Sequence, residues 1–372
     1  MTTFNEKEYL ISTAEYGANF WNAMRGISHA YDKIHGGANG ITGGYARPSG
    51  SNDKLQKAIK QESLFRSIST VVKAYGGASR IFAKDCADIA TWVPEGGSIP
   101  LQNGVNDFTR YAVDSHKLAV FVKLDDDFVH DAAFNIEAYL TDRLAENFAK
   151  AEDKGFVLGT GEHMPTGILD DTAGAETGIT SSALSFDNVL RLYHSIDTKY
   201  RKNAVWLMND ETALMLRILK DSAGNYLWNP SDNTILGKPV VISYDMPPVK
   251  DGAKPVVFGD FSYYWIIDRS HVSVQALKEH FVTLDQIGYL ATEFLDGKLI
   301  RRDALKALKI AAGAVAAILL AEAFGLQNAA SAGIITLLTV QNTRRETVMS
   351  SVRRFSGFAM MTLLCLPIYH FC

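Results

Sequence analysis

The stretch NIEAYLTDRLAENFAKAEDKGFVLGTGEHMPTGIL, residues 135–169, combines the longest helix pattern of the chain with a glycine-containing turn. Apolar residues recur at every fourth position, as Ile136, Leu140, Leu144 and Phe148. Asn135 is a residue type that caps helices well, so we expect a helix over residues 135–154 that stops at Gly155. Residues 156–169 then follow the pattern strand, glycine turn, strand.

Ahead of this helix, residues 70–124 change to strand patterns. RIFA at 80–83 and TRYAVDS at 109–115 alternate partly between apolar and polar residues, and KLAVFVKL at 117–124 is a short apolar run. Between the first two lies WVPEGGSIPLQNGVND, residues 92–107, which is rich in turn residues. The pattern predicts a long β-hairpin, which needs another surface to cover its edges because it has little core of its own.

Behind the helix, residues 185–248 alternate between helix and strand patterns. Ser185 and Asp210 are suited to cap two helices, and AVWLMN at 204–209 is typical of a buried strand. Residues 255–268 predict two more strands around a glycine. This mixture favours the α+β class over a regular array of βαβ units.

The N-terminal part is less regular. Residues 5–25 can form a short helix, whereas GGANGITGGYARPSGS, residues 36–51, holds six glycines and a proline. Glycine adds backbone freedom, so we expect a flexible arm there.

Composition divides the chain in two. The 372 residues carry 37 Lys+Arg against 41 Asp+Glu, a formal net charge of −4, which argues against binding nucleic acid through a large basic surface. Residues 309–372 hold five basic and two acidic residues, or +3, so residues 1–308 carry −4 minus 3, or −7. In residues 311–340, 21 of 30 residues are apolar. An acidic body is therefore followed by an apolar tail. Three cysteines without metal or disulfide spacing suggest a reducing compartment, and no signal peptide is visible at the start.

The sequence contains no recognisable motif for catalysis or cofactor binding. The turn Gly159-Thr160-Gly161 lacks the Gly-Lys-Ser/Thr of a phosphate loop, and no nucleophile elbow is present. The acidic run at residues 125–127 could hold a cation, but a solvated helix start is favoured. We therefore expect no catalytic, cofactor or metal site, and a structural or binding protein rather than an enzyme.

The order of the elements resembles the major capsid protein of tailed bacteriophages, of the Hong Kong 97 type, over about residues 5–308. The segments that carry the resemblance are the glycine-rich arm, the hairpin ending in WVPEGGSIP, the helix, FVLGTGEHMPTGIL, WLMNDETALMLRILKDSAGNYLW, ILGKPVVISYDMP and VVFGDFSYYWIIDR. The resemblance implies this division: an N-terminal helix and N-arm at 1–69, an E-loop hairpin with flanking strands at 70–124, a P-domain with a spine helix at 125–184, an A-domain at 185–255, and a return to the P-domain at 256–308.

The family's function implies that copies of this chain form hexamers and pentamers of a virion shell, assembled in the cytoplasm of a bacterial host. The hairpin would lie across a neighbouring subunit, through tip residues Trp92, Pro94, Glu95, Gly96, Gly97, Pro100 and Asn106. The tip contains no lysine, so the covalent Lys–Asn bond of some members is not expected. Implied partners are a separate scaffolding protein, a portal, a maturation protease and DNA packaged without sequence specificity.

The tail, residues 309–372, resembles the first membrane hairpin of aromatic acid exporter-type (fusaric acid resistance-like) proteins. Its two apolar segments have 17 and 12 residues, short of the roughly 20 that a spanning helix needs, so a buried helical hairpin is the alternative. Membrane association through residues 310–371 would place the basic stretch 343–354 in the cytoplasm. A gene fusion, a reading-frame join or a sequence-assembly artefact explains the tail best, with the capsid-like part ending near Lys309.

Two other functions fit parts of the sequence. An encapsulin-like nanocompartment would use the same fold around a cargo enzyme, and a membrane transporter would use the tail. Neighbouring portal, protease and terminase genes, or a cargo gene, would separate the first alternative from a phage shell. The transporter reading requires a complete transporter half, which the sequence lacks.

Overall fold

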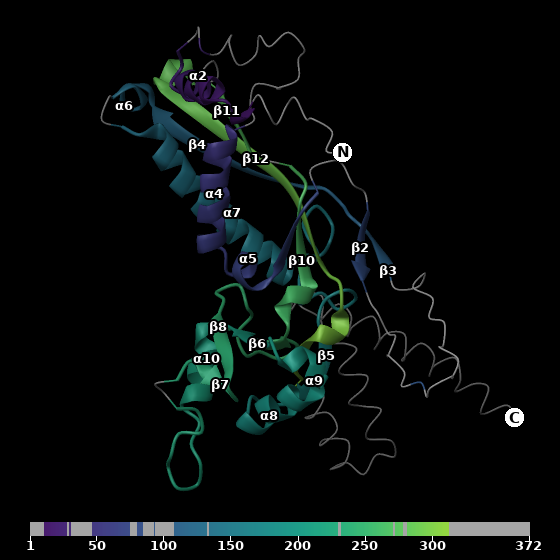
Figure 1. Ribbon diagram of the computed structural model, residues 1–372. Helices are drawn as coiled ribbons and strands as arrows, with labels where there is room; N and C mark the ends of the chain where they lie inside the picture. Colours follow the sequence, from purple (N-terminus) through teal and green to yellow (C-terminus); the bar gives the residue numbers. More distant parts are fainter. Residues whose placement is uncertain are drawn as a thin grey trace, which may run out of the picture. The chain divides into compact units, whose positions relative to one another are not determined.

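The computed structural model describes residues 11–27, 30, 47–74, 80–84, 93, 108–131, 134–229, 232–270, 272–277 and 281–311. The chain divides into two compact units (Figure 1). Unit 1 comprises Met1–Gly174 and Ser262–Arg301, and unit 2 comprises Ala175–Phe261 and Arg302–Cys372. The chain therefore passes from unit 1 to unit 2 and back, and then enters unit 2 a second time.

Unit 1 contains a five-stranded sheet built around one long strand, β12. Its strands are β1 (Thr70–Lys73), β4 (His116–Asp125), β10 (Tyr264–Asp268), β11 (Ser273–Leu277) and β12 (Gln286–Leu299). The order is β1-β10-β12-β11, with β4 also paired to β12. The β4–β12 ladder is antiparallel and runs from Gln286↔Asp125 to Leu295↔His116, which confirms the strand expected at 117–124.

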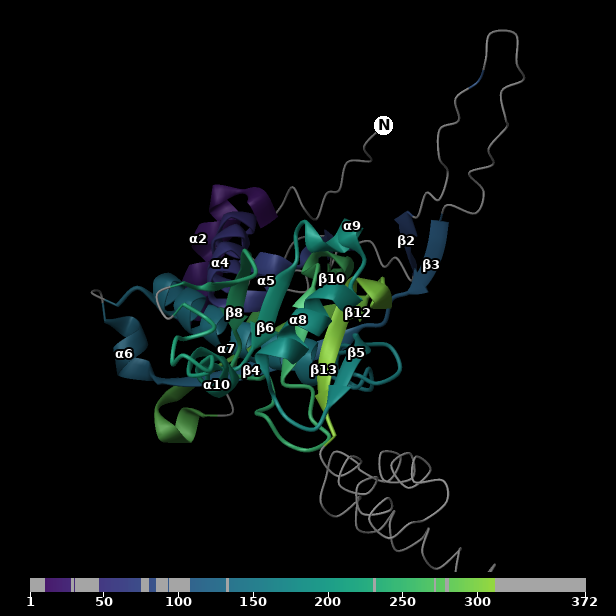
Figure 2. The same cartoon turned by 90° about the horizontal axis from the view of Figure 1, so that it is seen from below.

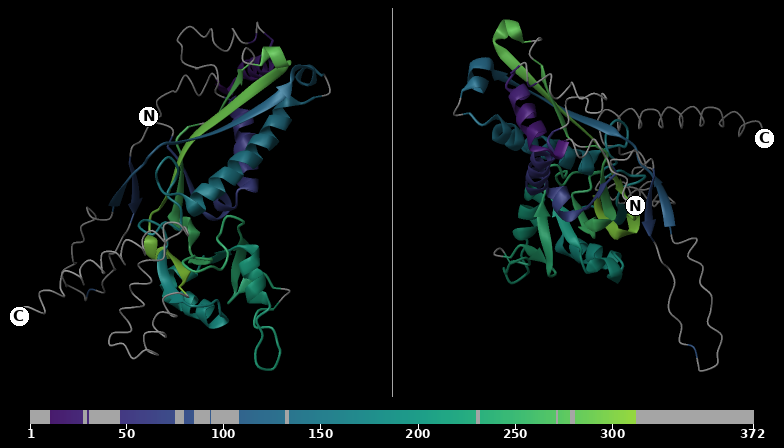
Figure 3. Two further views of the ribbon diagram at one scale, coloured as in Figure 1. Left: turned by 180° about the vertical axis from the view of Figure 1, so that it is seen from behind. Right: turned by 45° about the horizontal axis from the view of Figure 1, so that its top comes forward.

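The main helix of unit 1, α7 (Ile136–Leu158), runs beside β12 and β4 (Figure 3). Its start is capped as expected, because Oδ1 of Asn135 accepts a hydrogen bond from the amide of Ala138 at 3.1 Å. The predicted row of every fourth residue is buried, and it continues beyond Phe148 to Glu152 and Phe156. This row packs against the inward face of the sheet, where Ile287, Tyr289 and Ala291 of β12 are buried in the same cluster as the start of the row.

Shorter helices complete unit 1. They are α2 (Ala14–Met24), α4 (Ser49–Glu62), α5 (Leu64–Ile68), α6 (Asp126–His130) and the 3-10 turn η3 (Val282–Leu284). Helix α4 packs along α7 and buries Leu55 and Ile59 completely. Helix α2 adds Phe20 and Met24 to the same cluster, and Oη of Tyr289 donates to the carbonyl of Met24 at 2.9 Å. The glycine-rich stretch thus gives way to helix already at Ser49.

The expected strand–turn–strand after Gly155 is wrong. Helix α7 continues past this glycine, because the next residues, beginning with Phe156, are buried and hold the helix in place. The helix end is closed by the following segment, whose Ile168 amide donates to the carbonyl of Phe156 at 2.8 Å. A glycine is required at Gly159, since a Cβ there would lie 2.0 Å from the carbonyl oxygen of Pro165.

Unit 2 contains a six-stranded sheet in the order β5-β13-β9-β6-β8-β7. The strands are β5 (Glu176–Ser181), β6 (Val205–Met208), β7 (Thr234–Ile235), β8 (Lys238–Ile242), β9 (Val256–Gly259) and β13 (Leu305–Ile310). The helices are α8 (Phe186–Ser195), α9 (Thr198–Arg201), α10 (Asp210–Arg217) and η4 (Arg302–Ala304), and the 3-10 turn η2 (Phe261–Tyr263) spans the passage back to unit 1. Figure 2 shows β13 and β5 side by side with α8 close to them.

Of the two helix caps predicted in unit 2, one is confirmed and the other lies one residue earlier than expected. Ser185 caps α8 as expected, with its hydroxyl accepting from the amide of Asn188 at 3.3 Å. In α10 the cap is Asn209, whose Oδ1 accepts from the amide of Thr212 at 2.7 Å, while Asp210 lies in the first turn. Both residue types accept such bonds, so the sequence identified the helix but not the capping position.

The last described strand, β13, lies between β5 and β9 and buries Leu305, Leu308 and Ile310. It reaches one residue beyond Lys309, where the capsid-like part was expected to end. The membrane helices expected at 310–371 fall almost entirely on residues 312–372, outside the described residues. Among the residues that the structure does describe, no helix combines the length and the apolar character needed to cross a bilayer.

Candidate intersubunit surface

The predicted contact residues at the hairpin tip, Trp92, Pro94, Glu95, Gly96, Gly97, Pro100 and Asn106, lie outside the described residues. What the structure does describe is the base of the hairpin. Strands β2 (Arg80–Lys84) and β3 (Phe108–Ala112) pair antiparallel, from Arg80↔Ala112 to Lys84↔Phe108. They form a two-stranded sheet of their own, separate from the five-stranded sheet. The hairpin predicted from residues 80–115 is therefore confirmed at its base.

Apolar contacts attach this base to unit 1. Ile81, Ala83 and Val113 form a small buried cluster with Ile267 of β10 and Ile300. Oη of Tyr111 on β3 also donates to the carbonyl of Ile300 at 2.7 Å. The hairpin thus starts from a fixed position in unit 1.

A polar clamp lies where the hairpin joins β4. Nζ of Lys298 on β12 lies 2.7 Å from the carbonyl oxygen of Ala112, 2.9 Å from Oδ2 of Asp114 and 3.4 Å from Oδ2 of Asp296. The buried Asp296 also accepts from the amide of Asp114 at 2.8 Å, and Nε2 of His116 lies 3.5 Å from its Oδ1. The hydrogen bond and charge of Lys298 hold the pKa of Asp114 below its ordinary value.

The clamp has the donor types of a metal site. Ligand atoms of Asp114, His116 and Asp296 lie within 4.8 Å of one another. The ammonium of Lys298 already bonds to both carboxylates, so it supplies the positive charge that a cation would bring. We therefore assign this cluster a structural role. Sequence reasoning missed it because Asp114 and Asp296 are distant in the chain and carry no common motif.

Arg47, near the C-terminal end of the glycine-rich stretch, is fixed deep inside unit 1. Arg47 is fully buried; its Nη2 donates to Oγ1 of Thr141 at 2.8 Å, and its guanidinium lies 5.4 Å from the ring centre of Trp21. Burial lowers the pKa of Arg47 to about 10, although the charge of Glu137 opposes the shift. Whatever position the preceding arm takes, its C-terminal end is thus anchored on α7.

Each unit also exposes large apolar side chains that suit contact with other molecules. In unit 1, Phe82 of the hairpin is 54% exposed and Leu284 is 61% exposed. In unit 2, Leu214 on α10 and Ile218 directly after it are exposed, and Tyr244 after β8 is 93% exposed.

The fold is a mixed α+β subunit with a long spine helix and a β-hairpin that leaves the main sheet. A family model described as the phage capsid family matches residues 43–310, which include α4 and end at the last residue of β13. The chain belongs to the phage capsid family.

Two solved structures at 27–28% identity agree with this assignment. The capsid of a native GTA particle is 28% identical, with a TM-score of 0.54 over 66% of this chain and 89% of that chain. The capsid of an empty GTA particle is 27% identical, with a TM-score of 0.54 over 67% and 90% of the two chains. A structure from Microbacterium phage Oxtober96 is 13% identical, with a TM-score of 0.48 over 67% and 91%.

A second family model, aromatic acid exporter family member 1, matches residues 303–371. This agrees with the resemblance of the tail. The two matches overlap at 303–310, and these residues form η4 and β13 in the sheet of unit 2. The overlap therefore belongs structurally to the capsid fold. No curated protein matches the chain.

Proposed function

We propose that this chain is a major capsid protein, the self-assembling structural subunit of an icosahedral phage shell that encloses DNA. The observation that carries the proposal is the family match over residues 43–310, which extends through both units. Similarity to GTA capsids at 27–28% identity supports the same function. The role is structural, without an enzymatic activity.

The geometry explains how such a subunit would join its neighbours. The hairpin base is fixed to the rest of unit 1 by the clamp around Lys298, and we place the contact with a neighbouring copy on the hairpin. The exposed apolar residues on and directly after α10 of unit 2 would be covered in hexamers and pentamers. We extend the proposal to a separate scaffolding protein, a portal, a maturation protease and packaged DNA as partners, and to the virion as the final location.

For the tail, we propose that residues beyond Ala311 come from a different gene, through a fusion, a frame join or an assembly artefact. The match to the exporter model supports this proposal. Membrane association through these residues would be a property of the tail and not of the capsid fold.

Electron microscopy of the expressed chain tests the shell function. Residues 1–311 and the full chain should be produced with and without a co-expressed scaffolding partner. Closed, regular shells from residues 1–311 are expected. Purely monomeric protein under all these conditions would contradict the proposal, and a cargo enzyme inside the shells would favour a nanocompartment.

A further inference from the structure

Two glutamates interrupt the apolar interface between α7 and the sheet of unit 1. Glu152 occupies the fourth-residue row of α7, between the buried Phe148 and Phe156. Glu293 lies on the inward face of β12, in the same row as the buried Ala291 and Leu295. Both carboxyl groups are almost inaccessible, with Glu152 at 2% and Glu293 at 3% exposure. Buried charges are costly unless they are paired, so each group needs an explanation.

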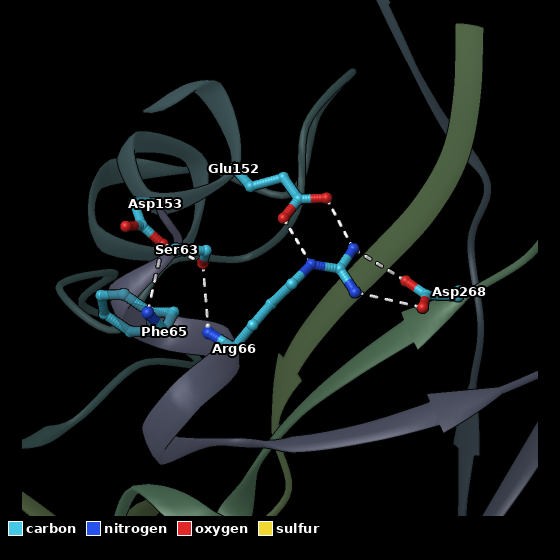
Figure 4. Close-up of polar contacts among 6 residues, drawn as sticks. All are labelled: Ser63, Phe65, Arg66, Glu152, Asp153 and Asp268. Atoms are coloured by element: carbon cyan, nitrogen blue, oxygen red, sulfur yellow. Dashed lines mark hydrogen bonds and ion pairs between the residues drawn. The ribbon is translucent and has the colours of Figure 1, made fainter. Parts of the chain in front are cut away.

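Arg66 of α5 pairs with the first of them (Figure 4). Its Nε and Nη2 lie 2.6 Å from the two carboxylate oxygens of Glu152, and its Nη1 and Nη2 lie 3.1 and 3.0 Å from those of Asp268 on β10. One guanidinium thus joins two carboxylates in two bidentate pairs. With both carboxylates ionised, Arg66, Glu152 and Asp268 together carry a net charge of −1. The guanidinium of Arg66 already bonds to both carboxylates.

Asp153, the neighbour of Glu152 on α7, does not take part in this pairing. It points to the start of α5, where it accepts from Oγ of Ser63 at 2.6 Å and from the amide of Phe65 at 3.2 Å (Figure 4). It also accepts from the amide of Leu64 at 2.9 Å. Its hydrogen bonds are therefore made at the start of α5 and not to the guanidinium of Arg66.

Glu293 is the fourth member of the cluster. The charged and titratable groups that face it are Arg66 on α5, Glu152 on α7 and Asp268 on β10, while its register partner on β4 is Leu118. Burial, the negative charge of Glu152 and a side-chain hydrogen bond with Glu152 all raise the pKa of Glu293. Its Oε1 is buried and has no hydrogen-bond partner among the described residues. Two carboxyl groups can share a hydrogen bond only if one of them carries a proton.

We propose that Glu293 and Glu152 share one proton in the folded subunit, and that loss of this proton at alkaline pH weakens the packing of α7 against β12. Without the proton, one guanidinium would face three ionised carboxylates inside unit 1. The hydrogen bond between Glu152 and Glu293 would be replaced by repulsion. The two surfaces that would separate are the row of α7 and the inward face of β12.

Loss of this proton lowers the stability of the folded subunit as the pH rises. Burial raises the pKa of Glu293 well above its ordinary value of 4.5, and the charge of Glu152 adds to the rise although Arg66 opposes it. The folded state therefore keeps a proton that the unfolded state releases above about pH 4.5. Between these two pKa values, each pH unit reduces the ratio of folded to unfolded protein about tenfold. Above the folded-state pKa the loss levels off, because both states are then deprotonated.

The test compares the full chain with Glu293→Gln, which keeps the shape and can still donate a hydrogen bond to Glu152. Urea unfolding of the unassembled subunit is followed from pH 5 to pH 9. The wild type should lose up to about tenfold in its folding equilibrium per pH unit relative to the variant. Glu162→Gln, at an exposed turn of the same unit, is the matched control and should follow the wild type. Parallel profiles for wild type and Glu293→Gln would overturn the proposal.

A second measurement does not depend on the variant's folding. Infrared spectroscopy of the wild type at neutral pH should show the carbonyl band of a protonated carboxyl group that resists exchange with solvent, and this band should disappear on alkaline titration together with native helix–sheet packing. Absence of the band at neutral pH would also overturn the proposal. Both measurements use the unassembled chain, so they stand even if the proposed shell function fails. If shells form, Glu293→Gln shells should persist to higher pH than wild-type shells.

Discussion

Where the capsid fold ends can be tested with two truncations that differ by two residues. A chain ending at Ala311 keeps the whole of β13, whereas a chain ending at Lys309 loses Ile310 and Ala311. Both variants lack the tail, so any difference between them comes from the edge of unit 2 alone.

The size of the difference follows from the contacts of these two residues. The amide of Ile310 donates to Ala253 at 2.9 Å, its carbonyl accepts from Gly252 at 2.7 Å, and the amide of Ala311 donates to Ser181 at 2.8 Å. Three such bonds contribute about 0.5–1.5 kcal/mol each. Burial of the Ile310 side chain, 3% exposed, contributes about 1.5–3 kcal/mol. The shorter chain should therefore be less stable by roughly 3–7.5 kcal/mol.

Urea unfolding followed by tryptophan fluorescence measures this difference, since Trp206 lies in the same sheet and is fully buried. We expect a lower midpoint and faster proteolysis for the chain ending at Lys309. If the two chains unfold at the same urea concentration, Ile310 and Ala311 contribute nothing to stability, and the capsid fold ends before them.

The other predictions concern the buried cluster and assembly. Arg66→Met leaves Glu152 and Asp268 without their partner and should destabilise the subunit by about 3–5 kcal/mol in chemical unfolding, so a change below 1 kcal/mol would contradict the pairing. Deleting residues 94–106 should give a soluble subunit that forms no shells under the electron microscope; normal particles would show that the hairpin tip is not needed. Mature particles boiled in detergent should run as single subunits on a gel, because the tip has no lysine, and a ladder of multimers would refute this.

The main helix of unit 1 could be predicted from the sequence because its burial follows a local period. The same period extends to Glu152, so the burial of this charged side chain also follows from the sequence pattern. Its continuation past Gly155 was not predictable in this way, since glycine normally ends helices and only the packing of Phe156 overrides that preference here. The point at which α7 ends depends on contacts with residues that are distant in the sequence.

In the candidate intersubunit surface, too, one feature follows from local sequence patterns and another does not. The base of the hairpin was predictable from two strand patterns around a turn-rich segment. The clamp of Lys298 on Asp114 and Asp296 was not, because it joins residues more than 180 positions apart. The partner of Glu293 was equally hidden, since α7 and β12 meet only in the folded unit.

The interleaved path of the chain has a consequence for synthesis on the ribosome. Unit 1 lacks β12, the strand that pairs with three others of its sheet, until residues 286–299 have been made. Unit 2 lacks β13, which lies inside its sheet, until residues 305–310 follow. Because these pairings are distant in sequence, folding should be slow and neither sheet can close early during translation. Unpaired strand edges on the nascent chain favour aggregation, so the yield of soluble subunits should depend on chaperones more than on the final stability of the fold.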